Sequence, residues 1–292
     1  MKLTALIIMI IVFTIFIFCS DRNETSTNRV DQGLVENDAI NEASGIDVSL
    51  LNSDILWTHN DSGDISRIFA MDKTGRNLGT FMLDGITARD WEDISVGPGP
   101  VEGKSYIYVA DIGDNRAEYE DKYIYRLEEP KIDMQKSPVD STIENIDVIH
   151  FQFPDGARDA ETLMVDPVTK DLIVVSKRED NVNVYRLVYP QKTDGTLTAE
   201  KIATIPHTQI CGGDISNSGS KIIIKNYDDI FFWHRSSGQS IEESMSTPAE
   251  ILDYVPEPQG EAVCWSSDEK GYFTISEEAE EIPAHLYYYP FQ

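Results

Sequence analysis

The chain has 292 residues, enough for one large all-β domain or for two domains of ordinary size. It carries 51 Asp and Glu residues against 24 Lys and Arg, a formal charge of −27. This balance argues against nucleic acid and anionic membrane surfaces as partners, because their phosphates repel such a chain. It favours cationic ligands or metal ions, or it serves only to keep an exported protein soluble.

The N-terminus contains a continuous apolar run, Leu3 to Phe18, which predicts an export signal over residues 1–19. An uncleaved membrane anchor is the alternative, although the run is slightly short for a span. The run ends in Phe16-Ile17-Phe18-Cys19, which resembles the cleavage box of bacterial lipoproteins except that Phe18 stands where a small residue is usual. Residues 20–30 are polar and predict a tether. We expect an exported protein, periplasmic or at the cell surface, that meets a membrane only through this segment or a lipid on Cys19.

One acidic phrase recurs along residues 31–292. The two most similar copies are Ala88–Val96 and Ala157–Val165, and looser copies begin at Ala43, Gly212 and Gly260. The second residues of the aligned copies fall at positions 44, 92, 161, 213 and 261, with spacings of 48, 69, 52 and 48 residues. A recurring unit of this size, rich in short strands, is typical of a β-propeller blade. The sequence therefore predicts a single all-β domain, a β-propeller with five blades.

Each repeat predicts four strands, because β-branched and aromatic runs alternate with turn residues. The first strand follows the acidic phrase. Second strands are predicted at Ile55–Trp57, Tyr106–Val109, Leu172–Val175, Ile222–Ile224 and Tyr272–Ile275. Third strands are predicted at Ile68–Met71, Tyr123–Leu127, Val184–Leu187, Phe231–Trp233 and Leu286–Tyr289. Outer fourth strands are predicted at Leu78–Phe81, Val148–Phe151, Lys201–Thr204 and Glu250–Leu252.

The fifth repeat lacks an outer strand of its own. Gln32–Val35, upstream of the first repeat, is expected to supply it and so to close the ring and cover its open edges. The long second repeat holds extra sequence, Asp133 to Glu144, which we expect to be a loop, with a sixth irregular blade as the alternative. No segment of useful length has helical periodicity.

Two cysteines, Cys211 and Cys264, fall in the first strands of the fourth and fifth repeats. Relative to the aligned positions they are offset by about 16 Å, at roughly 3.3 Å per residue. A disulfide requires Cα atoms within about 7 Å. We therefore predict two free, buried thiols.

Two sets of polar residues are expected on one face of the propeller, because the loop entering each first strand and the loop joining strands two and three emerge together. The first set is the repeated acid, Glu92, Glu161 and Glu261, with Asp214 in the fourth repeat and Ser44 in the first. The second set lies in the loops and comprises 59–64, 111–115, 177–181, 226–229 and 277–278. Carboxylates this close raise one another's pKa unless a cation intervenes. We predict a site for Ca²⁺, ahead of Mg²⁺, with ligands drawn from Glu92, Glu161, Asp214, Glu261, Asp61 and Asp111.

Each set also has a structural interpretation. The loop acids suit tight turns, and no EF-hand spacing is present. The repeated glutamates could instead bond backbone N–H groups that the inner strands leave unpaired at the channel.

Four basic residues are expected on the same face, namely Arg89, Arg158, Lys177 and Lys225. Cations beside metal-binding carboxylates suit an anionic oxygen ligand, such as a phosphate or carboxylate ester. For the arginines the alternative is pairing within the acidic phrase, with Arg89 held by Asp90 or Asp93.

The acidic repeat and the export signal together resemble the secreted calcium-dependent β-propeller hydrolases, of the phytase-like and gluconolactonase-like kinds. The resemblance implies Ca²⁺ over the channel and hydrolysis of a phosphoester, lactone or other ester. It also implies that Glu92, Glu161, Asp214 and Glu261 lie nearest the metal, while a carboxylate or His59 activates water. Those families usually have six blades, so a count of five departs from their pattern.

Two other functions stay open. Glycoside hydrolysis needs one carboxylate as acid and another as base, roles that Glu92, Glu161 and Glu261 could fill, with Trp91 or Tyr227 as a sugar platform. A non-catalytic propeller would bind a ligand or a protein on the same face. No Gly-x-Ser-x-Gly elbow, His-Glu-x-x-His or Walker loop points to another reaction. We expect a monomer that acts on a small anionic or ester substrate or binds a protein.

Overall fold

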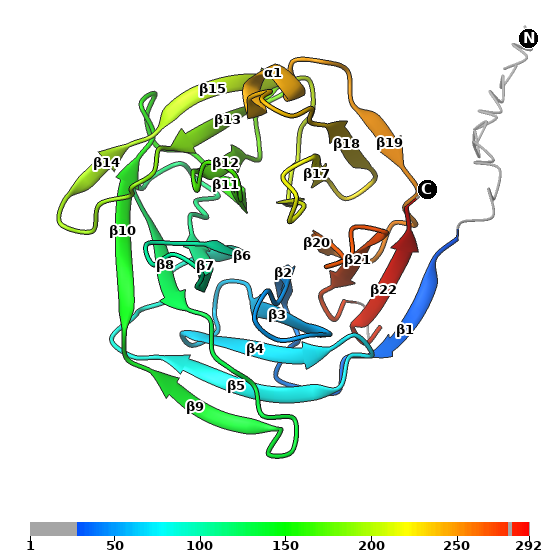
Figure 1. The fold of residues 1–292 in the computed structure, drawn as a ribbon. Helices are drawn as coiled ribbons and strands as arrows, with labels where there is room; N and C mark the ends of the chain where they lie inside the picture. The colour runs from blue at the N-terminus through cyan, green and yellow to red at the C-terminus, as the bar shows by residue number, and fades with distance from the viewer. Residues whose placement is uncertain (1–27, 280–281, 292) are drawn as a thin grey trace, which may run out of the picture.

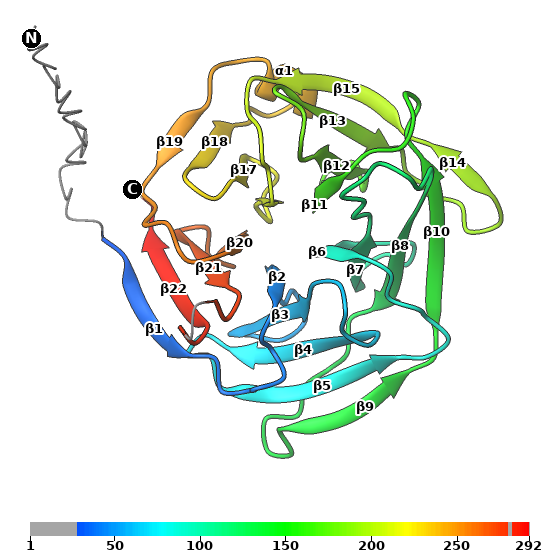
Figure 2. The ribbon, with the colours of Figure 1, turned by 180° about the vertical axis from the view of Figure 1, so that it is seen from behind.

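The protein is a ring of five β-sheets around a central channel (Figures 1 and 2). This computed structural model describes residues 28–279 and 282–291; the predicted export signal, residues 1–19, and most of the predicted tether lie outside them. The prediction of an all-β, five-bladed propeller is confirmed. Within the described ranges, no helix has the length and apolar character that crossing a membrane requires.

Blades 1 to 4 each have four antiparallel strands that run in sequence order from the channel outward, and blade 5 has three such strands of its own. Blade 1 contains β2 (Ala43–Val48), β3 (Ile55–Asn60), β4 (Arg67–Asp72) and β5 (Asn77–Leu83), and blade 2 contains β6 (Trp91–Pro98), β7 (Ser105–Asp111), β8 (Asp121–Glu128) and β10 (Ile146–Gln152). Blade 3 contains β11 (Ala160–Val165), β12 (Leu172–Ser176), β13 (Val182–Leu187) and β15 (Glu200–Ile205). Blade 4 contains β16 (Gly212–Ile215), β17 (Lys221–Lys225), β18 (Ile230–His234) and β19 (Glu250–Leu252). Blade 5 contains β20 (Gly260–Trp265), β21 (Gly271–Ser276) and β22 (His285–Pro290). We call the face on which the inner strands begin the upper face, and the opposite face the lower face.

The N-terminal strand closes the ring. β1 (Val30–Leu34) pairs antiparallel with β22, with Val30 opposite Tyr288 and Leu34 opposite His285. Blade 5 therefore has its fourth strand from the opposite end of the chain, as the sequence predicted.

The segment 133–144, predicted as a loop, contains a strand. β9 (Val139–Ile143) runs parallel to β5 and adds a fifth strand to blade 1. Gly79 permits this close approach, since a Cβ there would overlap the carbonyl oxygen of Val139. In the same way β14 (Thr196–Thr198) runs parallel to β10 at the edge of blade 2. The sixth-blade alternative is wrong, because the described residues form five sheets.

A short helix interrupts blade 4. α1 (Ile241–Met245) lies between β18 and β19 and begins with a capping box in which Ser240 and Glu243 bond each other's backbone N–H groups. Its five residues agree with the expectation that no long helix is present.

The hydrophobic core is divided among the interfaces between blades. Five clusters of buried side chains occupy the five interfaces, each drawing residues from two neighbouring blades. Cys264 belongs to the cluster between blades 1 and 5, and Cys211 is also fully buried. Both thiols are free, as predicted.

Aspartates connect the inner strands around the channel. Asp47, Asp93 and Asp214 are buried, and each accepts a hydrogen bond from a backbone N–H of the next blade. The donors are Val96 at 2.5 Å, Leu163 at 2.8 Å and Trp265 at 2.7 Å, respectively. The backbone-bonding role considered for the repeated glutamates therefore falls to these aspartates.

Candidate functional site

Bulges at the start of the inner strands direct the repeated glutamates. The register shifts at Glu92 in β6, at Glu161 in β11 and at Glu261 in β20, so each glutamate is the extra residue of a β-bulge. A bulge leaves its extra residue unpaired and re-aims the side chain. Ser44 occupies the equivalent bulge in β2, whereas the corresponding pairing in blade 4 is regular.

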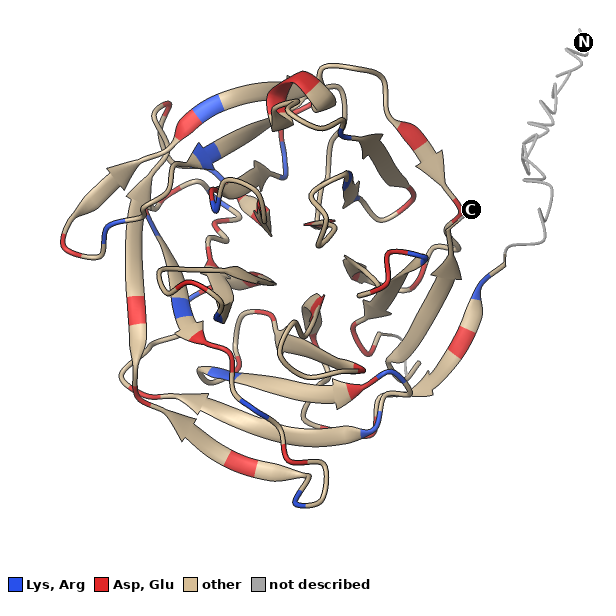
Figure 3. Ribbon diagram, in the orientation of Figure 1, with Lys and Arg blue, Asp and Glu red and all other residues tan. Residues whose placement is uncertain are grey.

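Seven carboxylates gather at the upper mouth of the channel. They form three overlapping groups whose oxygens lie within 4.8 Å of one another: Asp61, Asp90 and Glu92; Glu92, Asp159 and Glu161; and Asp61, Glu261 and Glu277. Glu92 and Asp61 each belong to two groups, so the carboxylates form an arc through blades 1, 2, 3 and 5. We call this set the carboxylate arc. Figure 3 shows acidic positions on the loops of several blades around the channel.

Lys177 closes the arc. It follows β12, and its ammonium group forms ion pairs with Glu161 and, at 3.8 Å, with Glu261. It also donates to the Tyr227 hydroxyl at 3.0 Å, and that hydroxyl in turn donates to Glu261 at 2.6 Å. A ligand approaching this side of the mouth therefore meets a lysine that is already paired.

Burial and mutual repulsion make these carboxylates hard to ionise. Burial raises the pKa of Glu92 well above its usual value, and repulsion from Glu161 and Asp61 raises it further. Burial likewise raises the pKa of Asp61 to about 6 and the pKa of Glu277 to about 7. For Glu161, burial and the charge of Glu261 raise the pKa to about 8 even though Lys177 opposes them. Carboxyl groups in this state are poised to exchange protons for a cation near neutral pH.

Two of the six predicted ligands lie apart from the other four. Glu92, Glu161, Glu261 and Asp61 come together as predicted, but Asp214 lies with Asp47 and Asp93 among the inner strands, bonded to Trp265. Asp111 is buried and accepts hydrogen bonds from the backbone of Arg89 and Asp90 and from the Tyr125 hydroxyl.

His59 is fully buried beside Trp91. Its Nδ1 lies 2.7 Å from the carbonyl oxygen of Asn60, and Nε2 has no partner among the described atoms. Burial lowers the pKa of His59 to about 4, so the ring is neutral at pH 7. Nδ1–H then donates to Asn60, and Nε2 carries the free lone pair.

The four predicted anion-binding residues all have protein partners. Arg89 donates to the carbonyl oxygen of Asp121 at 3.0 Å and pairs with Asp111, not with Asp90 or Asp93. Arg158 pairs with Asp155 and Glu179, and Lys225 donates to the carbonyl oxygen of Gly260. Trp91 is buried, so it cannot offer the sugar platform considered above.

Sequence reasoning missed three members of the carboxylate arc. Asp90 and Asp159 stand two residues before Glu92 and Glu161 in the same recurring phrase, and that repetition was the available signal. Glu277 belongs to the loop set 277–278, and the sequence does not single it out as a ligand. Tyr227, considered as a sugar platform, instead connects Lys177 to Glu261.

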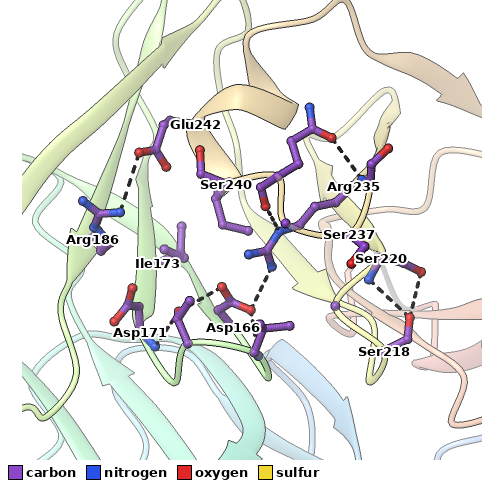
Figure 4. A pocket seen from close by; sticks show the side chains of 17 residues that line it. Asp166, Asp171, Ile173, Arg186, Ser218, Ser220, Arg235, Ser237, Ser240 and Glu242 are labelled. Atoms are coloured by element: carbon purple, nitrogen blue, oxygen red, sulfur yellow. Dashed lines mark hydrogen bonds and ion pairs between the residues drawn. The ribbon is translucent and has the colours of Figure 1, made fainter.

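A second hollow lies between blades 3 and 4 on the lower side (Figure 4). It has a volume of about 450 Å³ and includes Asp166, Arg186, Arg235 and Glu242 in its lining. Arg235 donates to Asp166 at 2.9 Å, and Arg186 lies 3.7 Å from Glu242. The charges of Arg235 and Asp166 neutralise each other, so this buried pair joins blades 3 and 4.

The fold and the site define the class of the protein as a five-bladed β-propeller with a carboxylate arc at its upper channel mouth. No protein-family model matches the chain, and no curated protein does. One solved structure, described as "Structure of Dos1 propeller", is similar at 12% identity and a TM-score of 0.38, over 85% of this chain and 78% of that one.

Proposed function

We propose that this protein binds a divalent cation, Ca²⁺ before Mg²⁺, at the upper channel mouth. The observation that carries the proposal is the Glu92 carboxylate, which is buried at 3% exposure, belongs to two carboxylate groups and has no hydrogen-bond donor among the described residues. Buried charges are normally paired or bound to metal. A hard cation with oxygen ligands satisfies the arc, because it replaces repulsion among carboxylates by attraction.

A contrast within the same protein supports this interpretation. Glu129 is equally buried, but its oxygens accept hydrogen bonds from Trp57 at 2.9 Å, from the Leu51 backbone at 3.0 Å and from Ser105 at 2.6 Å. Both oxygens of this structural carboxylate therefore accept hydrogen bonds from the protein. Glu92 has none, which distinguishes it from a structural carboxylate.

We further propose that the cation serves the hydrolysis of an ester, such as a phosphoester or lactone. A bound Ca²⁺ would supply Lewis-acid polarisation of the ester oxygen. Glu161 suits proton transfer, because a carboxyl group whose pKa lies near the working pH can both donate and accept a proton. His59 is neutral and has a free Nε2 lone pair, but its complete burial keeps it from direct contact with a substrate.

The second candidate function is binding without catalysis. It is favoured by one observation: Arg89, Arg158, Lys177 and Lys225, the residues expected to hold an anionic substrate, all have protein partners. A cation-binding propeller with no free anion clamp suits a ligand or protein that itself completes the metal coordination. Export and attachment through the N-terminus remain part of both proposals.

Calcium titration in solution separates these functions. The chelated protein is expected to show a lower Tm than the calcium-loaded protein, and turnover on a panel of aryl esters, phosphoesters and lactones is expected to follow the same dependence. If neither chelator nor Ca²⁺ changes the Tm, the proposal of metal binding is rejected. Calcium-dependent stability without turnover on the whole panel selects the binding function, and turnover on aryl glycosides that survives chelation selects a sugar hydrolase.

A further inference from the structure

The three carboxylate groups of the arc differ in how far the protein already neutralises them. In the group of Glu92, Asp159 and Glu161, Lys177 pairs with Glu161, while Asp159 accepts from Arg178 at 2.5 Å and from the Asp114 backbone at 2.8 Å. Two of its three carboxylates are therefore satisfied without a metal.

The group of Asp61, Glu261 and Glu277 is partly satisfied. One oxygen of Glu261 accepts from the Tyr227 hydroxyl at 2.6 Å, and the other lies 3.4 Å from the Ser44 hydroxyl, whose proton is donated to the Glu92 carbonyl oxygen at 2.8 Å. Lys177 adds a positive charge 3.8 Å from the same carboxylate. A cation bound here would have to displace or face this lysine.

The group of Asp61, Asp90 and Glu92 has no cation. Within the part of the chain that the structure describes, no ion pair reaches these three carboxylates, and Asp61 accepts only from the backbone of its neighbour Ser62. Burial and the charges of Asp159 and Asp111 raise the pKa of Asp90, and Arg89 only partly offsets them. Asp90 also lines a hollow of about 230 Å³, together with Asp114 and Arg116, so this carboxylate can be reached from solvent.

We propose that Lys177 is a built-in cation that fills one side of the carboxylate arc and leaves a single Ca²⁺ site at Asp61, Asp90 and Glu92. The ion then sits off the channel axis, between blades 1 and 2, and not at the centre of the ring. The single-site stoichiometry rests on the calcium binding proposed above, whereas the role of Lys177 as a resident cation does not.

The geometry of Lys177 fits that role. Its side chain is 7% exposed, and its ammonium group pairs with both Glu161 and Glu261, which belong to the other two carboxylate groups. Removing the ammonium group frees carboxylates on both sides of a space that a Ca²⁺ ion can enter, because Ca²⁺ tolerates irregular oxygen coordination at 2.3–2.6 Å.

The test is Ca²⁺ stoichiometry, measured by isothermal titration calorimetry on the purified chain with CaCl₂ as the only ligand. We expect one ion per chain for the wild type and two for Lys177→Met, and one for Lys177→Arg, which keeps the charge. Lys122→Met is the matched control: Lys122 is also buried and pairs with Asp114 at 3.1 Å, but it lies outside the arc. It is expected to bind one ion.

Each outcome has a defined meaning. One ion for Lys177→Met, or two for the wild type, rejects the inference and leaves the proposed function standing. No ion for the wild type rejects the proposed function, and a single ion gained by Lys177→Met would then still support Lys177 as a resident cation. If Lys177→Met does not fold, the Ca²⁺ site is mapped instead by substituting single carboxylates while Lys177 is kept. Asp90→Asn should then reduce Ca²⁺ affinity at least tenfold and Glu161→Gln less than threefold, and equal losses overturn the assignment.

Discussion

Replacing Glu92 by Gln should stabilise the metal-free protein, although it alters a buried residue. Glutamine keeps the shape of the side chain and removes the charge at the centre of the carboxylate arc. At the 4.8 Å limit that separates the carboxylate oxygens, one ionised neighbour costs about 3 kcal/mol at an effective dielectric constant of 20. Partial protonation relieves part of this repulsion, since a pKa shift of one unit corresponds to about 1.4 kcal/mol. We therefore expect a gain of about 1–3 kcal/mol, or roughly 2–10 °C in Tm.

The stabilisation that Glu92→Gln gives the metal-free protein should increase as pH rises. The pKa of Glu92 is raised in the folded protein, so the folded state binds more protons than the unfolded state above the usual carboxyl pKa. Wild-type stability therefore falls as pH rises above the usual carboxyl pKa, and the loss extends to about pH 8, where Glu161, with its pKa of about 8, is losing its proton. Glu92→Gln should be nearly neutral at the acid end and most stabilising at the alkaline end.

In Ca²⁺ the wild type should become more stable than Glu92→Gln. At a free Ca²⁺ concentration about 100-fold above Kd, the wild type gains about 2.7 kcal/mol, while the variant gains little. Thermal and urea unfolding in chelator and in Ca²⁺, across pH, measure both effects. Glu129→Gln is the control, because its hydrogen-bonded carboxylate should make it destabilising with an unchanged calcium response. If Glu92→Gln is as destabilising as Glu129→Gln at every pH, then Glu92 is a structural residue and the reasoning is refuted.

Three further predictions concern the surroundings of the arc and the joints between blades. Gly113→Ala should weaken Ca²⁺ binding by tenfold or more in calorimetry, because the added Cβ overlaps Glu92 Oε1; unchanged affinity would show that Glu92 is not a ligand. Arg235→Met should cost about 3 kcal/mol in urea unfolding, since it leaves the buried Asp166 without its ion pair, and a loss below about 1 kcal/mol would contradict this. Cys211 and Cys264 should react with a thiol reagent only after unfolding and without prior reduction, because both are buried and unpaired; a need for reductant would indicate a disulfide.

The blades were predictable because their strands carry continuous apolar runs, and because a recurring phrase marked each inner strand. Ile222–Ile224 and Tyr272–Ile275, for example, lie within β17 and β21. β9 was not predictable in the same way. Its sequence, Val-Asp-Ser-Thr-Ile, is mostly polar and partly exposed, and its partner β5 lies in another blade and runs parallel to it. No local pattern indicates a parallel pairing across blades.

The carboxylate arc was only partly predictable, because sequence spacing does not determine the direction of a side chain. Glu92, Glu161 and Glu261 point to the mouth since each occupies a bulge. Asp214 stands one residue after the aligned position, as Asp93 follows Glu92, and like Asp93 it bonds the backbone of the next blade. The partners of Arg89 could not be inferred either, because Asp111 approaches it from a different strand of blade 2.

The strand pairings at the outer rim affect which blades unfold together. β9 leaves blade 2 to join blade 1, and β14 leaves blade 3 to join blade 2, so two connections reach back over the preceding interface. Blades 4 and 5 have no such overlap among the described strands, and blade 5 depends on β1. Blades 1 to 3 should therefore open as one cooperative unit. In native-state hydrogen exchange, amides of β17 to β22 should exchange through a smaller opening than those of β3 to β13.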